Sequence, residues 1–231
     1  IDGPIGDDLS SILTKYKNLY PDIINLVKLD KNMGLGKALN EGLSHCKNEI
    51  VARQDSDDIS LPDRMEKQIK LILETNADII SGTVSEFADS PENKKGERKL
   101  PTTNAEIIKF SRKRNPFNHP AVMFLKKSVT DAGGYNEEFH LFEDYYLWIR
   151  MLKKGAIGTN TDDVIVYMRV DDNTMMRRGG KSYASDMLRF HKWLKSSGWS
   201  SWTDYLTGAI PHAVICILPN KIRSIIYKIL H

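Results

Sequence analysis

The run Ile50-Val51-Ala52-Arg53-Gln54-Asp55-Ser56-Asp57-Asp58 joins an apolar segment directly to three aspartates. The apolar residues predict a buried strand, so the acidic side chains lie where that strand ends. Carboxylates this close together repel one another unless solvent or a cation neutralises them. Mg²⁺ and Mn²⁺ prefer one or two carboxylates together with phosphate oxygens and water. The run therefore indicates metal and diphosphate chemistry, and the competing interpretation is a solvated turn or a helix cap.

The composition narrows the class of protein. The chain has 231 residues, 41% of them hydrophobic, which is enough for one large domain with a tail. Lys and Arg number 33 against 30 Asp and Glu, and a net charge of +3 is too small to indicate a nucleic-acid partner. Cys46 and Cys216 have neither a metal-ligand spacing nor a disulfide framework, so we expect a cytoplasmic protein.

The first third of the chain alternates short apolar runs with helical periodicity. We expect helices over 7–20, from the glycine turn 32–36 to Cys46, and from Pro62 to Thr75, with strands over 23–29 and 49–53. This alternation predicts an α/β sheet, and helix crossovers favour parallel strands. Ligands of such sheets bind at the carboxyl ends of the strands, where the acidic run lies.

The second part of the chain predicts a mixed α and β region. Strands are expected over 78–84, 121–125 and 164–170, a helix over 143–154, and a mobile loop over 89–98. The apolar segment 208–218 is too short to cross a bilayer. Beyond Pro219 an apolar stripe with Lys221, Arg223 and Lys228 predicts either a membrane-surface helix or a helix packed on the body.

Several motifs in order resemble the inverting glycosyltransferases of family two. The first is Asn32-x-Gly34-x-Gly36-x-Ala38-x-Asn40-x-Gly42, and the second continues from Ala52 through the acidic run to Asp63-Arg64. The later ones are Asn118-His119-Pro120, Gly133-Gly134-Tyr135 and Phe142-Glu143-Asp144-Tyr145-Tyr146-Leu147-Trp148. The resemblance implies a GT-A fold, a Rossmann-type mixed sheet flanked by helices, over residues 1–180, with a C-terminal helical tail over 181–231.

The resemblance also implies an activity. A sugar would pass from a nucleotide-diphosphate donor, with UDP-hexose as the default, to a saccharide or lipid-linked saccharide in cell-surface polysaccharide synthesis. Mn²⁺ or Mg²⁺ would hold the diphosphate. The enzyme would lie in the cytoplasm, with peripheral contact at the inner face of the plasma membrane as an open alternative. The donor sugar and its base are not readable from the sequence, because single hydroxyl groups distinguish hexoses.

Roles for the acidic residues follow from matching the motifs. Asp57 is the expected primary metal ligand, and Asp55 matches a position directed at the metal or the donor ribose. Asp58 is either a third ligand or the cap of the helix that Pro62 opens. Asp144 matches the catalytic base, and helix capping is its competing role. Glu143 would bind the acceptor or perturb the pKa of its neighbour.

The remaining candidates are basic or belong to the nucleotide pocket. Arg53 would meet donor phosphates or pair with an aspartate. Lys37 would hold donor oxygens or lie solvated at the surface, and His119 would approach the acceptor or serve as a structural histidine. The segment Arg177-Arg178-Gly179-Gly180 resembles a basic segment that closes over the donor phosphates in family members, and a flexible loop explains its glycines equally well.

The start of the chain resembles the end of the strand that normally follows the first βα unit of this fold. Ile1-Asp2-Gly3 would be its remnant, with Asp2 as the surviving nucleotide-pocket residue, so we expect an N-terminally truncated chain that lacks the first strand and helix. Two alternative functions compete with sugar transfer. One is a nucleotidyltransferase acting on sugar phosphates, and the other is a noncatalytic carbohydrate-binding domain.

Overall fold

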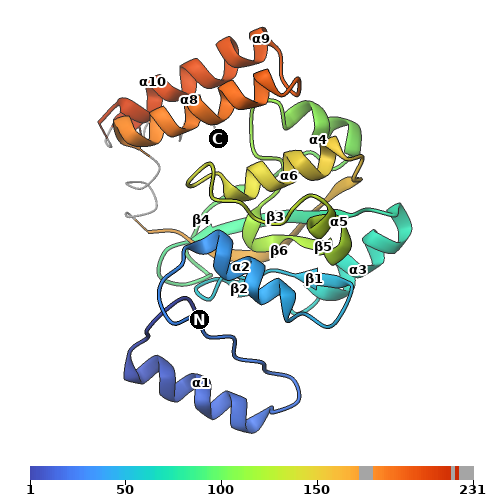
Figure 1. The fold of residues 1–231 in the computed structure, drawn as a ribbon, viewed down its shortest axis with the longest axis vertical. Helices are drawn as coiled ribbons and strands as arrows, with labels where there is room; N and C mark the ends of the chain where they lie inside the picture. The colour runs from blue at the N-terminus through green and yellow to red at the C-terminus, as the bar shows by residue number, and fades with distance from the viewer. Residues whose placement is uncertain (172–178, 220–221, 224–231) are drawn as a thin grey trace.

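The computed structural model describes residues 1–171, 179–219 and 222–223 of the chain. A six-stranded mixed sheet forms its centre, with the order β1-β5-β3-β6-β2 and β4 paired with β3 (Figure 1). The strands are β1 (Ile50–Ala52), β2 (Ile59–Ser60), β3 (Ile79–Phe87), β4 (Lys94–Arg98), β5 (Met123–Leu125) and β6 (Gly158–Arg169). This is the predicted α/β class with a mixed sheet.

The pairing of the strands corrects the expectation of a parallel sheet. Among the named strands only β3 and β6 run parallel, whereas β1 with β5, β2 with β6, β3 with β4 and β3 with β5 are antiparallel. The long segment between β3 and β5 contains β4 and α4 (Asn104–Phe110), so β5 returns against β3 in the opposite direction. Most neighbouring strands of this sheet are therefore antiparallel and need no helical crossover.

Helices cover both faces of the sheet because neighbouring residues of a strand point to opposite sides. Ile80 packs with Ile72 of α3 (Arg64–Thr75) in one cluster. Ile79 belongs to a larger cluster on the other face, where Trp148 of α6 (Glu143–Lys153) is fully buried. The helices α2 (Leu35–Ser44) and α5 (Lys126–Asp131) add residues to that second cluster.

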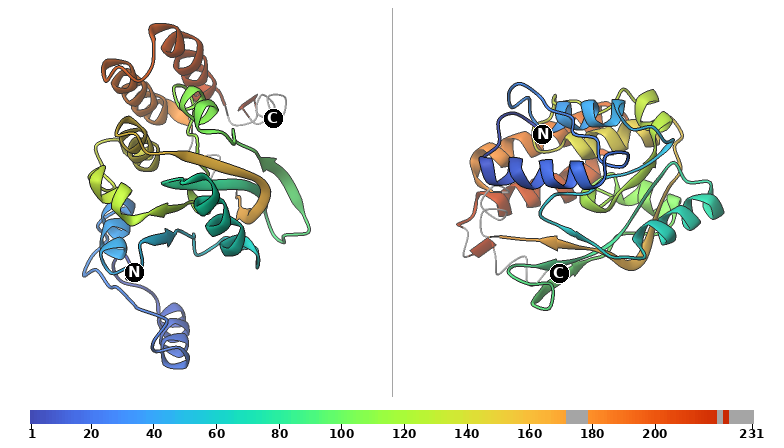
Figure 2. Two further views of the ribbon diagram at one scale, coloured as in Figure 1. Left: turned by 90° about the vertical axis from the view of Figure 1, so that its right-hand side faces the viewer. Right: turned by 90° about the horizontal axis from the view of Figure 1, so that it is seen from below.

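The N-terminal helix and the C-terminal helices lie at opposite ends of the molecule. The helix α1 (Asp7–Leu19) stands apart below the sheet, as predicted for residues 7–20, and α8 (Gly180–Ser196) and α10 (Ile210–Ile217) lie at the top (Figures 1 and 2). Between them run the short elements α9 (Trp202–Asp204) and η2 (Tyr205–Ala209). Helices α8 and α10 bury apolar side chains against α6, so α6 is shared by the sheet core and the C-terminal helices.

Two predicted segments differ from the structure. The strand expected over 23–29 is absent, because Ile23 is 81% exposed and only Leu29 forms an isolated bridge, with Asp2. The loop expected over 89–98 contains β4, an edge strand whose residues are mostly exposed on both faces. An edge strand of that kind needs no apolar alternation, so its sequence looks like a loop.

The expected segments of the C-terminal tail lie only partly within the described residues. The apolar segment expected over 208–218 is helical as α10, and the stripe beyond Pro219 falls mainly outside the described residues. Within the described ranges, none of the helices combines the length and apolar character that a bilayer crossing requires. The division of the chain at residue 180 stays a prediction.

Candidate active site

The acidic run forms a turn between β1 and β2 that Arg53 organises. The Arg53 backbone N–H donates to the Val122 carbonyl at 3.0 Å, which continues the pairing of β1 with β5 by one residue. Its buried guanidinium then donates two hydrogen bonds to the carboxylate of Asp55, with Nη1 2.7 Å from Oδ2. Of the two roles predicted for Arg53, the structure thus shows the pairing with an aspartate. Its Nε is also buried and has no partner among the described residues.

Asp58 connects the turn to the neighbouring strand. Its Oδ1 accepts a hydrogen bond from the backbone N–H of Arg169 at 2.8 Å, while Oδ2 is buried with no partner among the described residues. Burial, together with the charges of Asp55 and Asp57, raises the pKa of Asp58 to about 6, against the opposing effect of the hydrogen bond from Arg169. Asp58 does not cap α3, since the N-cap residue there is Asp63, without a side-chain bond. The capping interpretation was wrong.

Arg64 also holds this turn, a role that was not predicted from its motif. Its side chain is fully buried at the start of α3. Nη2 donates to the carbonyls of Arg53 and Val122 at 2.8 and 3.2 Å, and Nη1 donates to Gln54 Oε1 at 2.6 Å. Nε donates to Gln68 Oε1 at 2.9 Å. A single guanidinium therefore joins the acidic turn, β5 and α3, because its planar fork presents donors in several directions.

Asp144 lies in the first turn of α6 with a side chain only 18% exposed. Its Oδ1 accepts the Tyr145 backbone N–H at 2.7 Å, and Oδ2 accepts Asn115 Nδ2 at 2.7 Å. Burial raises the pKa of Asp144, and these two hydrogen bonds oppose that shift. The N-cap residue of α6 is Phe142, so Asp144 is not the cap. Asn115 was not among the predicted site residues, because nothing local in the sequence indicates a contact with Asp144.

His119 lies beside Asp144 without forming an ion pair. His119 Nδ1 is 3.9 Å from Asp144 Oδ2, and Nε2 is hydrogen-bonded to the Tyr135 hydroxyl at 3.0 Å. Burial lowers the pKa of His119 well below its usual value, and the charge of Arg53 lowers it further, so the imidazole is neutral. The histidine therefore has the satisfied, structural environment of one of its two predicted roles, at the edge of the site.

Tyr135 joins this group to α2, which explains the Gly133-Gly134-Tyr135 motif. Asn40 Nδ2 donates to the Tyr135 carbonyl and the Tyr135 N–H donates to Asn40 Oδ1, both at 2.8 Å. Gly134 has a φ of +65°, and a Cβ there would lie 2.7 Å from Asn40 Oδ1. Glycine is required at this position because a side chain would push Asn40 away from the Tyr135 backbone.

The acidic turn and Asp144 face a common neighbour. The positive charge of Arg53 lowers the pKa of Asp144, against the larger effect of burial, and it acts in the same way on Tyr135. The charges of Asp55 and Asp144 both raise the pKa of Tyr135, after burial. The contacts show the same arrangement, because the Arg53 N–H donates to the Val122 carbonyl at 3.0 Å and the Val122 N–H donates to the His119 carbonyl at 3.4 Å. Since His119 Nδ1 lies 3.9 Å from Asp144 Oδ2, the fold brings residues of the two distant motifs into one region.

Glu143, next to Asp144, is also buried. Its Oε1 lies 3.5 Å from His140 Nδ1, and its negative charge contributes to the raised pKa of Asp144. The predicted effect on the pKa of its neighbour is thus present in the structure. Its predicted contact with the acceptor stays a prediction.

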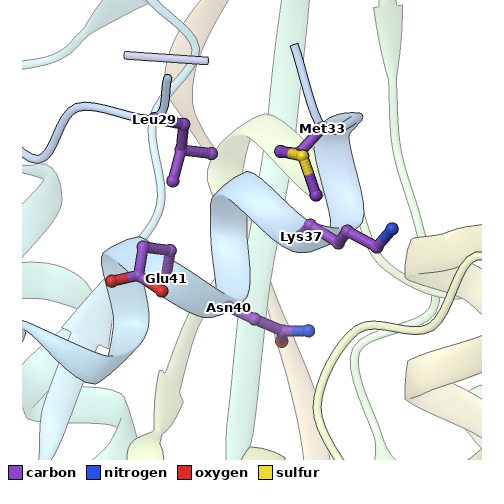
Figure 3. Close-up of a pocket in the computed structure, with 5 residues that line it drawn as sticks. All are labelled: Leu29, Met33, Lys37, Asn40 and Glu41. Atoms are coloured by element: carbon purple, nitrogen blue, oxygen red, sulfur yellow. The ribbon is translucent and has the colours of Figure 1, made fainter. Parts of the chain in front are cut away.

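Lys37 and Asp2 lie around the N-terminus of α2. Lys37 lines a pocket of about 360 Å³ together with Leu29, Met33, Asn40 and Glu41, and its side chain extends away from that of Glu41 (Figure 3). Lys37 Nζ is 3.6 Å from Glu137 Oε2. Asp2 accepts the backbone N–H groups of Met33 and Gly34 at 2.6 and 3.1 Å. Both oxygens of Asp2 therefore hold the glycine turn, where Gly34 has a φ of +88°.

Arg177 and Arg178 lie outside the described residues, so their predicted contact with donor phosphates stays a prediction. Asp57 is exposed, and its carboxylate has no hydrogen bond or ion pair within the described part of the chain, although its carbonyl accepts from Arg169 Nε at 3.3 Å. Asp57 thus contributes a free carboxylate at the tip of the turn.

The turn suits a hard divalent cation in its chemistry. The unpartnered Oδ2 of Asp58 and the exposed carboxylate of Asp57 are oxygen donors of the kind that Mg²⁺ and Mn²⁺ prefer. Over the described ranges, no group of three or more His, Cys, Asp or Glu side chains could hold a metal without help. Most of the coordination would therefore come from substrate oxygens and water, as is usual for Mg²⁺ with phosphates.

Comparison with known proteins places this geometry in a family. The sequence model described as Glycosyl transferase family 2 matches residues 1–134, which is more than half of the chain. The chain belongs to glycosyltransferase family 2. An uncharacterised glycosyltransferase of Haemophilus influenzae is 43% identical over 192 residues, covering 83% of this chain and 70% of that protein. The chain is thus a glycosyltransferase, as the motifs predicted.

Two further relatives of this glycosyltransferase have more specific names. One is the UDP-Gal:alpha-D-GlcNAc-diphosphoundecaprenol beta-1,3-galactosyltransferase of Escherichia coli, 37% identical over 98% of this chain and 82% of that protein. The other is the amylovoran biosynthesis glycosyltransferase AmsE of Erwinia amylovora, 34% identical over 98% of this chain and 84% of that protein.

Solved structures support the predicted GT-A fold of the glycosyltransferase. Residues 1–349 of S. aureus TarS in complex with UDP-GlcNAc have a TM-score of 0.58 at 15% identity, and the match covers 81% of this chain and 54% of that solved chain. The mannosyltransferase PcManGT from Pyrobaculum calidifontis, in complex with GDP-Man and Mn²⁺, also has a TM-score of 0.58, at 18% identity. It covers 94% of this chain and 59% of PcManGT, so both solved chains are much longer.

Proposed function

We propose that this glycosyltransferase transfers a hexose from a UDP-sugar to a lipid-linked saccharide, with inversion at the anomeric carbon and with a divalent metal, in the synthesis of a surface polysaccharide. The supporting relative is the E. coli galactosyltransferase, whose name includes a UDP-sugar and a diphosphoundecaprenol acceptor and whose alignment covers nearly all of this chain. An enzyme that acts on such an acceptor works at the inner face of the plasma membrane. The name of AmsE adds a second polysaccharide pathway among the relatives.

One observation carries the proposal: the carboxylate of Asp144 is largely buried, is held by Asn115, and lies 3.9 Å from His119, whose segment pairs with Arg53 of the acidic turn through Val122. A carboxylate with a raised pKa is a stronger base than an exposed aspartate. A general base must also be fixed in position to reach the attacking hydroxyl group, and its two hydrogen bonds fix Asp144.

The reaction follows from these positions. The acceptor hydroxyl oxygen attacks the anomeric carbon of the donor from the side opposite the diphosphate, and its proton passes to the ionised carboxylate of Asp144. The bond between the anomeric carbon and the β-phosphate oxygen breaks, and its electron pair leaves with the nucleoside diphosphate. A metal bound at Asp57, with Asp55 beside it, would stabilise the charge that develops on this leaving group.

Other predicted residues take supporting roles in the proposal. The unpartnered Nε of Arg53 is a buried donor that the diphosphate oxygens would satisfy. Asp2 would act on the nucleotide through the turn that it holds, and Lys37 lines the neighbouring pocket. His119 and Glu143 would line the side of the site where the acceptor binds. Family membership favours sugar transfer over nucleotidyl transfer.

The proposal is tested by turnover and by the stereochemistry of the product. Sugar nucleotides are supplied with Mn²⁺ and a GlcNAc-diphosphate lipid, UDP release is measured, and the new linkage is assigned by NMR coupling constants. We expect a β-linked product from an α-linked UDP-hexose. An α-linked product would contradict inversion, and binding without turnover would support the noncatalytic alternative.

Metal dependence is tested at Asp57. Asp57→Asn is expected to abolish the increase in Mn²⁺ affinity that UDP causes and to lower kcat/KM by about 10²- to 10³-fold, because a stabiliser of leaving-group charge is lost. Mn²⁺ binding is followed by electron paramagnetic resonance of the free ion, which does not depend on turnover. Asp89→Asn, at another exposed aspartate, is the control. Full activity after treatment with EDTA would refute the metal role.

A further inference from the structure

An apolar surface lies at the top of the molecule, along the segment α9–η2–α10. Five large apolar side chains follow each other at intervals of three or four residues and are between 39% and 61% exposed: Trp202, Leu206, Ile210, Val214 and Ile217. Residues 205–219 contain no Asp, Glu, Lys or Arg. We call these five side chains the C-terminal apolar ridge. A row of this length on a helix face left open by the described residues marks an interaction site.

The opposite side of the same helices is already occupied. Ala213 and Cys216 of α10 are buried in the cluster that also contains Phe190 of α8 and Tyr145 of α6. The ridge therefore points outward from a fixed helix pair. The buried and exposed positions of this segment alternate with helical spacing, as they do in a surface helix that packs one face and exposes the other.

Positive charge borders the ridge along one side. Lys113 Nζ is 2.9 Å from Thr207 Oγ1 and 3.5 Å from Asp204 Oδ1, which fixes the segment after α4 against α9 and η2. Lys109, Arg112 and Arg114 line the same pocket as Asp204, and all three are exposed. No carboxylate of the described residues lies within ion-pair distance of these three cations.

The carboxylates nearby are largely engaged. Glu106 accepts from the Thr103 hydroxyl in the capping box of α4, and Asp204 accepts from Ser201 as well as pairing with Lys113. Asp162 is the third acidic residue of the pocket lining. Lys195 Nζ lies 3.9 Å from the centre of the Trp202 ring. The ridge thus has cations beside it and a tryptophan in contact with a lysine at one end.

We infer that the C-terminal apolar ridge docks onto an anionic lipid bilayer. An apolar helix face with a tryptophan at its end and lysines and arginines on its flanks suits the boundary between acyl chains and acidic headgroups. A second copy of the chain fits less well, because a two-fold interface would bring the unpaired cations of the two copies together. This docking does not depend on the proposed reaction.

If the acceptor is lipid-linked, docking on a bilayer would also affect the reaction. This consequence, unlike the docking itself, rests on the proposed function. The ridge and Asp144 are connected through α6, since α6 packs on α8 and α10. The bilayer would then set the orientation of the active site relative to the membrane surface, and the diphosphate lipid would approach from a constant direction.

The test is co-sedimentation of the whole chain with vesicles, without donor or acceptor. We expect binding to vesicles of phosphatidylcholine mixed with phosphatidylglycerol, and weaker binding to phosphatidylcholine alone or at high salt. Leu206→Glu/Val214→Glu should lower the affinity at least about tenfold, because it removes apolar insertion and adds negative charge. Lys109→Gln/Arg112→Gln should weaken binding only to the anionic vesicles.

A matched control separates the ridge from a general effect of charge. Ile23→Glu/Leu73→Glu changes the net charge equally at two exposed apolar residues, 81% and 69% exposed, in other parts of the fold. This control should bind vesicles like the unaltered chain, and circular dichroism should show both double variants folded. The inference is overturned if the unaltered chain binds no vesicles, if the control loses as much affinity as the ridge variant, or if sedimentation velocity shows a dimer that the ridge variant dissociates. Because no sugar is transferred in this assay, its failure leaves the proposed function standing.

Discussion

Asp144→Asn is expected to lower kcat by about 10²- to 10⁴-fold, the range that general base catalysis contributes. The asparagine keeps the size of the side chain but accepts no proton from the attacking hydroxyl group. The affinity for UDP, measured by calorimetry with Mn²⁺, should stay nearly unchanged. The control is Asp131→Asn, because Asp131 is an exposed aspartate paired with Lys127 on α5. Unchanged turnover in Asp144→Asn would remove the proposed base.

The pH dependence gives a second measurement on the same group. Burial raises the pKa of Asp144, so the base is protonated and kcat/KM falls at a higher pH than for an exposed aspartate. Asn115→Leu removes a hydrogen bond that favours the ionised form and lowers the pKa of Asp144, so the acidic limb of the profile should move to higher pH. A limb that stays in place or moves down would show that Asn115 does not position Asp144.

Arg64→Met is expected to reduce the free energy of unfolding by about 3 to 5 kcal/mol, because it leaves four hydrogen-bond partners, most of them buried, without their donor. Those partners are the side-chain oxygens of Gln54 and Gln68 and the carbonyls of Arg53 and Val122. The measurement is urea unfolding followed by circular dichroism. Arg64→Lys should recover part of the loss, because an ammonium keeps the charge but lacks the planar fork.

The control for this change is Lys70→Met on the same helix. Lys70 is largely exposed and lies 3.9 Å from Glu74 across one turn, so its loss should cost less than about 0.5 kcal/mol. If Arg64→Met and Lys70→Met had equal effects, Arg64 would not brace the acidic turn. Measuring UDP binding on the folded fraction would then show whether the turn keeps its shape without this arginine.

Much of the fold could be predicted from the sequence because its signals are local. Helical periodicity located α1 and α6 within two residues, and the apolar run before Arg53 located β1. The segment 23–29 looked like a strand for the same reason, yet Ile23 is exposed and the segment pairs only at Leu29. An apolar run predicts a strand only if other strands are available to pair with it.

The candidate site was predicted only where a short motif marks it. Asp57 and Asp144 lie in such motifs, and the structure brings those motifs into one region. The contacts that hold the site join residues far apart in the chain: Asn115 to Asp144 over 29 positions, Asn40 to Tyr135 over 95. No single-sequence pattern encodes such pairs, because either partner alone is an ordinary polar residue.

Because α6 belongs to both apolar clusters, it limits which segments can be exchanged between this protein and its relatives. One side of the helix completes the core above the sheet through Leu147, Trp148 and Met151, and another side receives the C-terminal helices through Tyr145, Tyr146 and Ile149. A chimera that exchanges residues 180–219 alone would set foreign side chains against the second side. Successful grafts should therefore take α6 along with its partners, so that the seam between donor and recipient sequences falls outside both clusters.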